Sequence, residues 1–146
     1  MHHRTRLVRP TVAVVAAAAA CVALASPAAA VGGRPFTVEL TGAAEVPGPG
    51  DPDGSGTATL TVNPGRGEVC WSIDVSDIAD PLAAHIHVGA VDVAGPVVVP
   101  LDPNAPGCAT VDRELAREIV RDPSAYYVNV HNAEYPAGAV RGQLDR

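Results

Sequence analysis

The sequence predicts an all-β protein with one folded domain and one short helix. Its 146 residues include 14 glycines and 14 prolines. After residue 30 these residues divide the chain into short segments, which argues against long helices. Most of the segments alternate apolar and polar residues, the period of a strand with one buried face. Only the stretch near residues 112–121 has apolar residues at helical spacing.

The first 30 residues have the three-part layout of a secretory signal peptide. Three arginines precede an apolar run over residues 11–25, and the small residues SPAAA follow it. The run is shorter than the roughly 20 residues that a membrane-spanning helix needs. A lipoprotein acylated at Cys21 is disfavoured because alanine fills the three preceding positions. We therefore expect cleavage near Ala30, a domain over residues 31–146, and a secreted, extracytoplasmic protein without membrane attachment.

The charge of the predicted domain disfavours two classes of partner. All 16 acidic residues follow Ala30, against seven of the ten basic ones, which gives the domain a net charge of −9. It contains no lysine. An acidic domain without a basic cluster is not expected to bind nucleic acid or an anionic membrane.

Three strands are predicted in the first half of the domain, over residues 36–40, 56–63 and 68–75. Alternate residues of each strand are apolar and are expected to enter the core. They are Phe36, Val38 and Leu40, then Ala58, Leu60 and Val62, then Val69, Trp71, Ile73 and Val75. The PGRG link predicts that the last two strands form a hairpin. Before this hairpin, Asp51 and Asp53 are expected in a solvated loop rather than in a calcium site.

Three further strands are predicted over residues 83–89, 126–132 and 138–144, and each combines an apolar face with a polar face. The polar faces carry His85 and His87, then Asn129 and His131, then Arg141 and Gln143. If the strands share one sheet, these side chains gather into one binding patch. An ordinary solvated sheet face more often carries Thr, Ser, Lys and Glu, so the patch is chemically specialised.

The predicted helix near residues 112–121 lies between these strands. Val111, Leu115 and Ile119 recur at helical spacing. Asp112 is a suitable N-cap, and Pro123 ends the helix.

Cys70 and Cys108 are the two cysteines that follow Ala30. In an exported protein they most simply form one disulfide, because the compartment is oxidising. The alternative is a pair of buried free thiols. Neither cysteine lies in a CxxC motif or beside a candidate base, so no redox role is expected.

Five motifs of the chain resemble the CHRD domain, a module named after the animal protein chordin and also found alone in exported bacterial proteins. They are LTGAAEVPGPG, GSGTATLTVN, AAHIHVGA, GPVVVPL and YYVNVHNAEYPAGAVRGQL. The resemblance spans residues 36–144, and the order of HIH, NVH and RGQ makes it specific. It implies an all-β, immunoglobulin-like β-sandwich or barrel outside the cytoplasm. It implies no particular ligand, because the bacterial members have no settled biochemical role.

The patch has three interpretations. Two histidines at i and i+2 on a strand point to the same side, so His85 and His87 can join His131 in binding one copper or zinc ion. Alternatively, the histidines are structural hydrogen bonders to the backbone, to Asn129 and to Glu45. The third interpretation is recognition of an extracellular protein or small ligand.

Glu45, in the AAEVP element, is the seventh predicted member of the patch and the expected ion-pair partner of Arg141. No Ser/His/Asp or Cys/His nucleophile arrangement is recognisable. A dismutase with two metals needs more histidines than the three that remain after signal cleavage. We therefore expect a non-enzymatic binding or structural module, with a mononuclear copper- or zinc-binding protein as the alternative.

Overall fold

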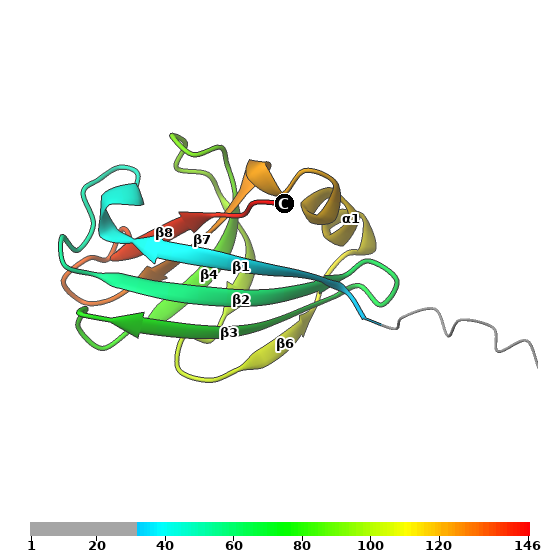
Figure 1. Ribbon diagram of the computed structural model, residues 1–146, viewed down its shortest axis with the longest axis horizontal. Coiled ribbons are helices and arrows are strands. Elements are labelled where there is room, and N and C mark those ends of the chain that lie inside the picture. The colour runs from blue at the N-terminus through cyan, green and yellow to red at the C-terminus, as the bar shows by residue number, and fades with distance from the viewer. Residues whose placement is uncertain (1–31) are drawn as a thin grey trace, which may run out of the picture.

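The computed structural model describes residues 32–146, which fold into one antiparallel sheet of eight strands. The strands are β1 Arg34–Thr41, β2 Ser55–Asn63, β3 Glu68–Ser76, β4 Ala83–Val88, β5 Val97–Leu101, β6 Gly107–Thr110, β7 Tyr126–His131 and β8 Val140–Gln143. Their order in the sheet is β5-β4-β7-β8-β1-β2-β3-β6. The sheet folds over on itself, with β1, β2, β3 and β6 in one layer and β4, β7 and β8 behind them (Figure 1). The fold is therefore all-β, a nearly closed barrel or sandwich, as predicted.

The core lies between the two layers and is filled by the alternating residues of the strands. On β1, Phe36 and Val38 are buried, and they stand opposite Leu60 and Ala58 of β2. The other layer contributes alternating apolar residues of β4 and β7, which are Ala84, Ile86, Val128 and Val130. The apolar face of β3 is less deeply covered than predicted, because Trp71, Ile73 and Val75 are only partly buried against this core.

The β2–β3 hairpin forms as predicted, with Asn63 opposite Glu68 across its turn. Gly67 closes that turn with a φ of 64°, a left-handed conformation that suits glycine. Its carbonyl accepts a hydrogen bond from Val111, which places the start of the helix beside the turn.

The predicted helix is α1, Arg113–Arg121. The Asp112 side chain caps it by accepting hydrogen bonds from the backbone N–H groups of Glu114 and Leu115, at 2.7 and 3.4 Å. Ala116 and Ile119 are buried in the core. Two 3-10 turns, η1 Gly42–Ala44 and η2 Pro123–Ala125, follow β1 and α1.

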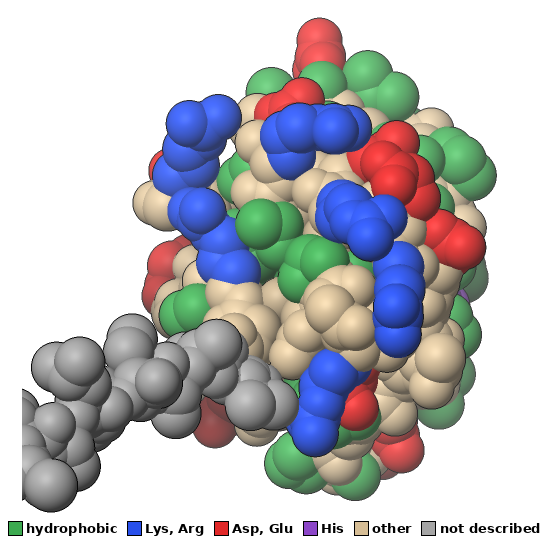
Figure 2. Space-filling view, turned by 90° about the vertical axis from the view of Figure 1, so that its right-hand side faces the viewer, with side chains coloured by type: hydrophobic (Ala, Val, Ile, Leu, Met, Phe, Trp, Pro, Cys, Tyr) green, Lys and Arg blue, Asp and Glu red, His purple; other side chains and the backbone are tan. Residues whose placement is uncertain are grey.

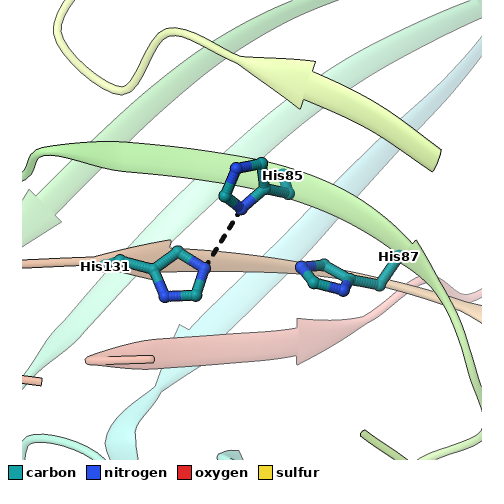
Figure 3. Close-up of side chains that lie close together, drawn as sticks. All are labelled: His85, His87 and His131. Carbon is teal, nitrogen blue, oxygen red and sulfur yellow. Dashed lines mark hydrogen bonds between the residues drawn. The ribbon is translucent and has the colours of Figure 1, made fainter. Parts of the chain in front are cut away.

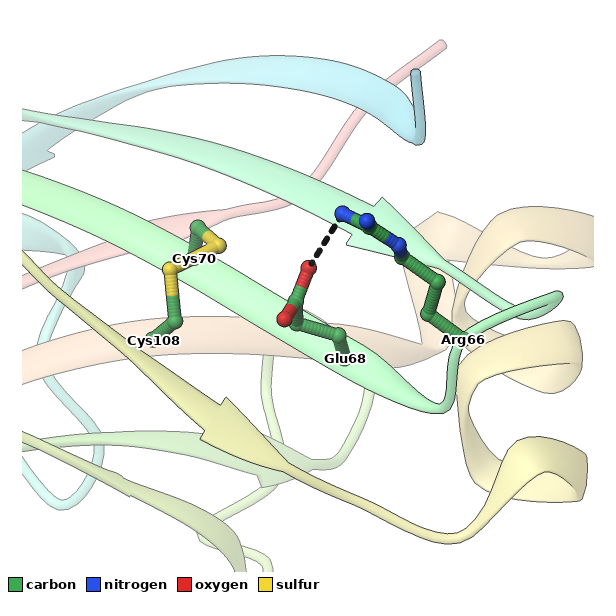
Figure 4. Close-up of a disulfide and its surroundings, with 4 residues drawn as sticks. All are labelled: Arg66, Glu68, Cys70 and Cys108. Carbon is green, nitrogen blue, oxygen red and sulfur yellow. Dashed lines mark ion pairs between the residues drawn. A yellow bond between two sulfur atoms is a disulfide. The ribbon is translucent and has the colours of Figure 1, made fainter. Parts of the chain in front are cut away.

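The disulfide between Cys70 and Cys108 is present, as predicted. The two cysteines are direct neighbours across β3 and β6, so the bond fastens the short edge strand β6 to the sheet (Figure 4). It joins residues 38 positions apart, which in the chain-entropy model is a stabilisation of about 4 kcal/mol.

The strands β5 and β6 were not predicted from the sequence. The segment of β5, VVVPL, is apolar at successive positions and shows no alternation, and β6 has only four residues. The predicted solvated loop before β2 is also partly wrong. Asp51 is buried, its backbone N–H donates to Ala139, and its side chain accepts a hydrogen bond from the backbone of Asp53.

The predicted signal peptide lies outside the described residues. Among residues 32–146, no helix has the length and apolar character needed to cross a membrane.

Candidate functional site

The predicted patch forms on the outer face of β4, β7 and β8, because these three strands are neighbours in the sheet. One row of paired residues runs across them from His85 through Asn129 to Arg141. The next row runs from His87 through Tyr127 to Gln143. His131 lies two residues beyond Asn129 on β7 and completes the set. We call these side chains the polar face.

Three members of the polar face, His85, His87 and His131, converge and form the histidine cluster. Each offers one ring nitrogen within 4.8 Å of those of the other two (Figure 3). Nδ1 of His85 lies 3.1 Å from Nε2 of His131. The sequence-based prediction that these histidines lie together is therefore confirmed.

His87 is held in one orientation. Its Nδ1 lies 2.8 Å from the carbonyl oxygen of Gly95, and a carbonyl only accepts, so Nδ1 carries the hydrogen. The ring also stacks on Tyr127, with centroids 4.7 Å apart. In the neutral ring Nε2 then holds a lone pair. That nitrogen is buried and has no hydrogen-bond partner, and Figure 3 shows a ring nitrogen of His87 facing His131.

His131 is fixed in the same way. Its Nδ1 lies 3.1 Å from the carbonyl oxygen of Pro136 and therefore donates to it. Its Nε2 is left with a lone pair, which faces Nδ1 of His85 at 3.1 Å and Oδ1 of Asn129 at 3.0 Å. Two of the three imidazoles thus point an unprotonated nitrogen into the cluster.

The cluster disfavours protonated histidine. Burial lowers the pKa of His85, and the neighbouring His131 and His87 lower it further. Burial also lowers the pKa of His131. The hydrogen bond to Pro136 raises this pKa in part, and the neighbouring His87 lowers it further. Both rings are therefore neutral at pH 7, the form that binds a metal.

Tyr127, Arg141 and Gln143 form a second group, the loop clamp, which holds the loop over residues 89–95. The Arg141 guanidinium is 1% exposed and donates to the carbonyls of Ala90 and Val93, at 2.8 and 3.1 Å. The Gln143 amide donates to the carbonyl of Gly89 at 2.8 Å. These predicted patch residues are thus covered by the loop.

Tyr127 connects the loop clamp to the histidine cluster, and sequence analysis did not single it out. The Arg141 guanidinium carbon lies 3.4 Å from the centroid of its ring, and His87 stacks on the ring as well. Both groups cannot occupy the same face, so Tyr127 is enclosed between them. Its hydroxyl accepts a hydrogen bond from the backbone N–H of Gly95 at 3.1 Å. The alternation of β7 already placed Tyr127 on the polar face, and that position is the signal that could have found it.

The expected ion pair between Glu45 and Arg141 is wrong: the ion pairs of the described residues do not include it. Glu45 is 5% exposed, and its Oε1 has no hydrogen-bond partner. Burial raises the pKa of Glu45 to about 7, although Arg141 and the backbone N–H of Val46 lower it. Gly138, at a φ of 147°, packs against this carboxyl group, and a side chain there would collide with it. Arg141 takes backbone carbonyls as partners instead.

Two other surfaces lie away from the polar face. A hollow of about 420 Å³ on β1, β2 and β3 is lined by Glu39, Thr57, Asp74 and neighbouring hydroxyl side chains. Arginines gather on the face that contains α1 (Figure 2). On the helix itself, Arg117 and Arg121 pair with Glu114 and Glu118, at 2.9 and 4.0 Å. These exposed pairs describe a solvated helix surface.

Comparison with known proteins gives one match. The sequence model of the CHRD domain matches residues 36–144, which is nearly all of the described chain. No curated protein and no solved structure matches the chain.

Proposed function

This chain belongs to the CHRD domain family, and we propose that it is an exported, non-enzymatic binding module that holds one copper or zinc ion in the histidine cluster. The family membership supports a binding or structural module. The disulfide is compatible with an extracytoplasmic location. The choice of a metal as ligand rests on the three histidines.

The observation that carries the proposal is the buried Nε2 of His87, which has no hydrogen-bond partner. A buried polar atom without a partner is costly, and an unsatisfied one in a folded protein calls for an explanation. Here the other ring nitrogen is held by the carbonyl of Gly95, the arrangement that typically orients a metal-binding histidine. His131 repeats the arrangement with the carbonyl of Pro136.

The spacing of the cluster supports a first-row metal. Ligand nitrogens in a tetrahedral site with bonds of about 2.0–2.1 Å lie roughly 3.3 Å apart. Those of His85 and His131 are 3.1 Å apart, and the set spans at most 4.8 Å, so a small inward movement of one ring closes the site. On binding, His85 takes the tautomer with its hydrogen on Nε2, which leaves Nδ1 unprotonated as a ligand. Imidazole nitrogen suits zinc and copper.

The proposal is tested by titrating the exported protein, purified without an affinity tag, with zinc and with copper. We expect one equivalent to bind and to raise the free energy of unfolding, by about 2.7 kcal/mol at a free metal concentration 100 times Kd. His87→Ala should lose stoichiometric binding. Asp74→Ala, in the hollow on the other layer, is the control and should keep it. Wild-type protein that binds neither metal would exclude the proposal.

Recognition of an extracellular protein or small ligand is the second candidate function. It is favoured by the loop over residues 89–95, in which Val91 and Val93 are 66% and 46% exposed while the loop clamp fixes the backbone. Apolar side chains on a fixed protrusion offer a binding surface. Val91→Asp should abolish capture of a partner from the extracellular medium and leave zinc binding unchanged.

A further inference from the structure

Asn129 lies on β7 beside the histidine cluster. It stands directly opposite His85 on β4 and opposite Arg141 on β8. Its side chain is 2% exposed. The oxygen Oδ1 lies 3.0 Å from Nε2 of His131, the same nitrogen that faces His85.

The contact between Nε2 of His131 and Oδ1 of Asn129 has no hydrogen between its two atoms. Because Nδ1 of His131 donates to Pro136, Nε2 is an acceptor, and the amide oxygen of Asn129 is an acceptor too. The one ring N–H that reaches the pair belongs to Nδ1 of His85, and it can serve only His131. Two acceptors at 3.0 Å repel each other, whereas a cation between them would bind both.

We propose that Oδ1 of Asn129 is the fourth ligand of the metal, so that the site is a closed set of three imidazole nitrogens and one amide oxygen. This inference rests on the proposed function of the histidine cluster. The separations of 3.0 and 3.1 Å around Nε2 of His131 are close to the roughly 3.3 Å between ligands of a tetrahedral site. Asn129 and His131 are neighbours on the same face of β7, which explains how one strand supplies two ligands.

A closed shell has a chemical consequence. Catalytic zinc sites keep one position open for water or substrate, whereas structural sites fill all four with protein groups. With Asn129 as a ligand the metal has no vacant position. The metal is therefore structural or cargo, and it does not activate a substrate.

The test uses cobalt(II) as a spectroscopic substitute for zinc in the exported protein. A four-coordinate cobalt site absorbs strongly in the visible, and its spectrum changes when an anion takes an open position. The wild-type cobalt spectrum should not respond to azide, whereas Asn129→Ala should bind azide and should bind zinc at least about tenfold more weakly, the scale on which such site residues act. Asn129→Asp, of the same shape, should bind zinc at least about tenfold more tightly because its oxygen is charged.

Asn132→Ala is the matched control. Asn132 is as buried as Asn129, but its amide oxygen accepts hydrogen bonds from the backbone of Glu134 and Tyr135. Its loss should lower stability and leave the cobalt spectrum unchanged. If the Asn129 amide instead donated its N–H to His131, it would compete with the metal, and Asn129→Ala would bind zinc more tightly.

The outcomes separate the two proposals. A wild-type cobalt site that binds azide would overturn the role of Asn129 but not the metal-binding function. This measurement uses the wild-type protein alone, so it does not depend on whether a variant folds. Tighter zinc binding by Asn129→Ala, or weaker binding by Asn129→Asp, would do the same. Wild-type protein that binds neither cobalt nor zinc would remove both proposals.

Discussion

The histidine cluster, on β4 and β7, and the loop clamp, on β7 and β8, lie side by side on the polar face, yet they differ in whether their polar atoms have hydrogen-bond partners. In the loop clamp, the donors of Arg141 and Gln143 reach carbonyl oxygens of the loop over residues 89–95. In the histidine cluster, Nε2 of His87 is buried without a partner. Nε2 of His131 accepts from His85 but also faces a second acceptor, Oδ1 of Asn129. Polar groups that are satisfied within the chain build the fold, whereas buried ones left unsatisfied are available to a ligand.

Removal of Arg141 should have the largest effect on stability. Arg141→Ala deletes a buried side chain and leaves the carbonyls of Ala90 and Val93 without their donor. We expect the free energy of unfolding to fall by about 3–5 kcal/mol, measured by urea denaturation. Arg117→Ala, on the exposed side of α1, is the control and should change it by less than about 0.5 kcal/mol. A loss below about 1 kcal/mol for Arg141→Ala would contradict a structural role for the clamp.

The second prediction concerns Glu45, the acid that the sequence assigned to Arg141. Its folded pKa of about 7 lies above the usual 4.5, so its contribution to stability is complete below about pH 4.5 and is lost as the pH rises through 7. Glu45→Gln removes this loss of stability, because the amide does not ionise. At pH 8 the variant should be more stable than the wild type by about 3 kcal/mol, and at pH 4 the two should be nearly equal. Equal stability at both values would mean that the carboxyl group is ionised without cost.

Removal of His131 should affect metal binding far more than stability. His131→Ala should abolish zinc binding but lower the stability of the metal-free protein by only about 2 kcal/mol, because the hydrogen bonds to Pro136 and from His85 are lost. Calorimetric titration and urea denaturation of the same sample measure both effects. If the stability loss matched that of Arg141→Ala, the histidine cluster would be a structural network like the clamp.

The smallest expected effect is the acid response of the metal-free protein. The pKa values of His85 and His131 are lowered in the folded state, so the stability they contribute is present above about pH 6.5 and is lost as the pH falls through their lowered values. This trend is opposite to that of Glu45, so it is best measured in the Glu45→Gln variant. In that variant, adding His85→Asn should flatten the decline between pH 7 and pH 5. An unchanged decline would show that the cluster does not disfavour protonation.

Much of the fold follows from alternation in the sequence. In β1 and β2 the apolar residues occur at every second position, so a single buried face decides both strand and register. The segments of β5 and β6 carry no such signal, because VVVPL is apolar throughout and GCAT is too short. Their places in the sheet depend on partners far along the chain, including the disulfide to Cys70.

The candidate site was also predicted in part, because alternation indicates which side chains share a face but not which loop covers them. The i and i+2 spacing of His85 and His87 and the alternation of β7 place three imidazoles on one face, and local pattern is enough for that. The partner of Arg141 was predicted wrongly, because a guanidinium commonly pairs with a carboxylate but here it finds backbone carbonyls. The loop that supplies its carbonyls is brought over the sheet only by tertiary structure. The sequence of residues 89–95 has no pattern that indicates this position.

The disulfide also changes what a protease can do to this protein. The exposed loop over residues 89–95 lies between Cys70 and Cys108 in the chain. A single cut there divides the chain into one piece with His85 and His87 and another with His131. The two pieces stay covalently joined at β3 and β6 and paired along β4 and β7, so a nicked molecule keeps all three histidines in one particle.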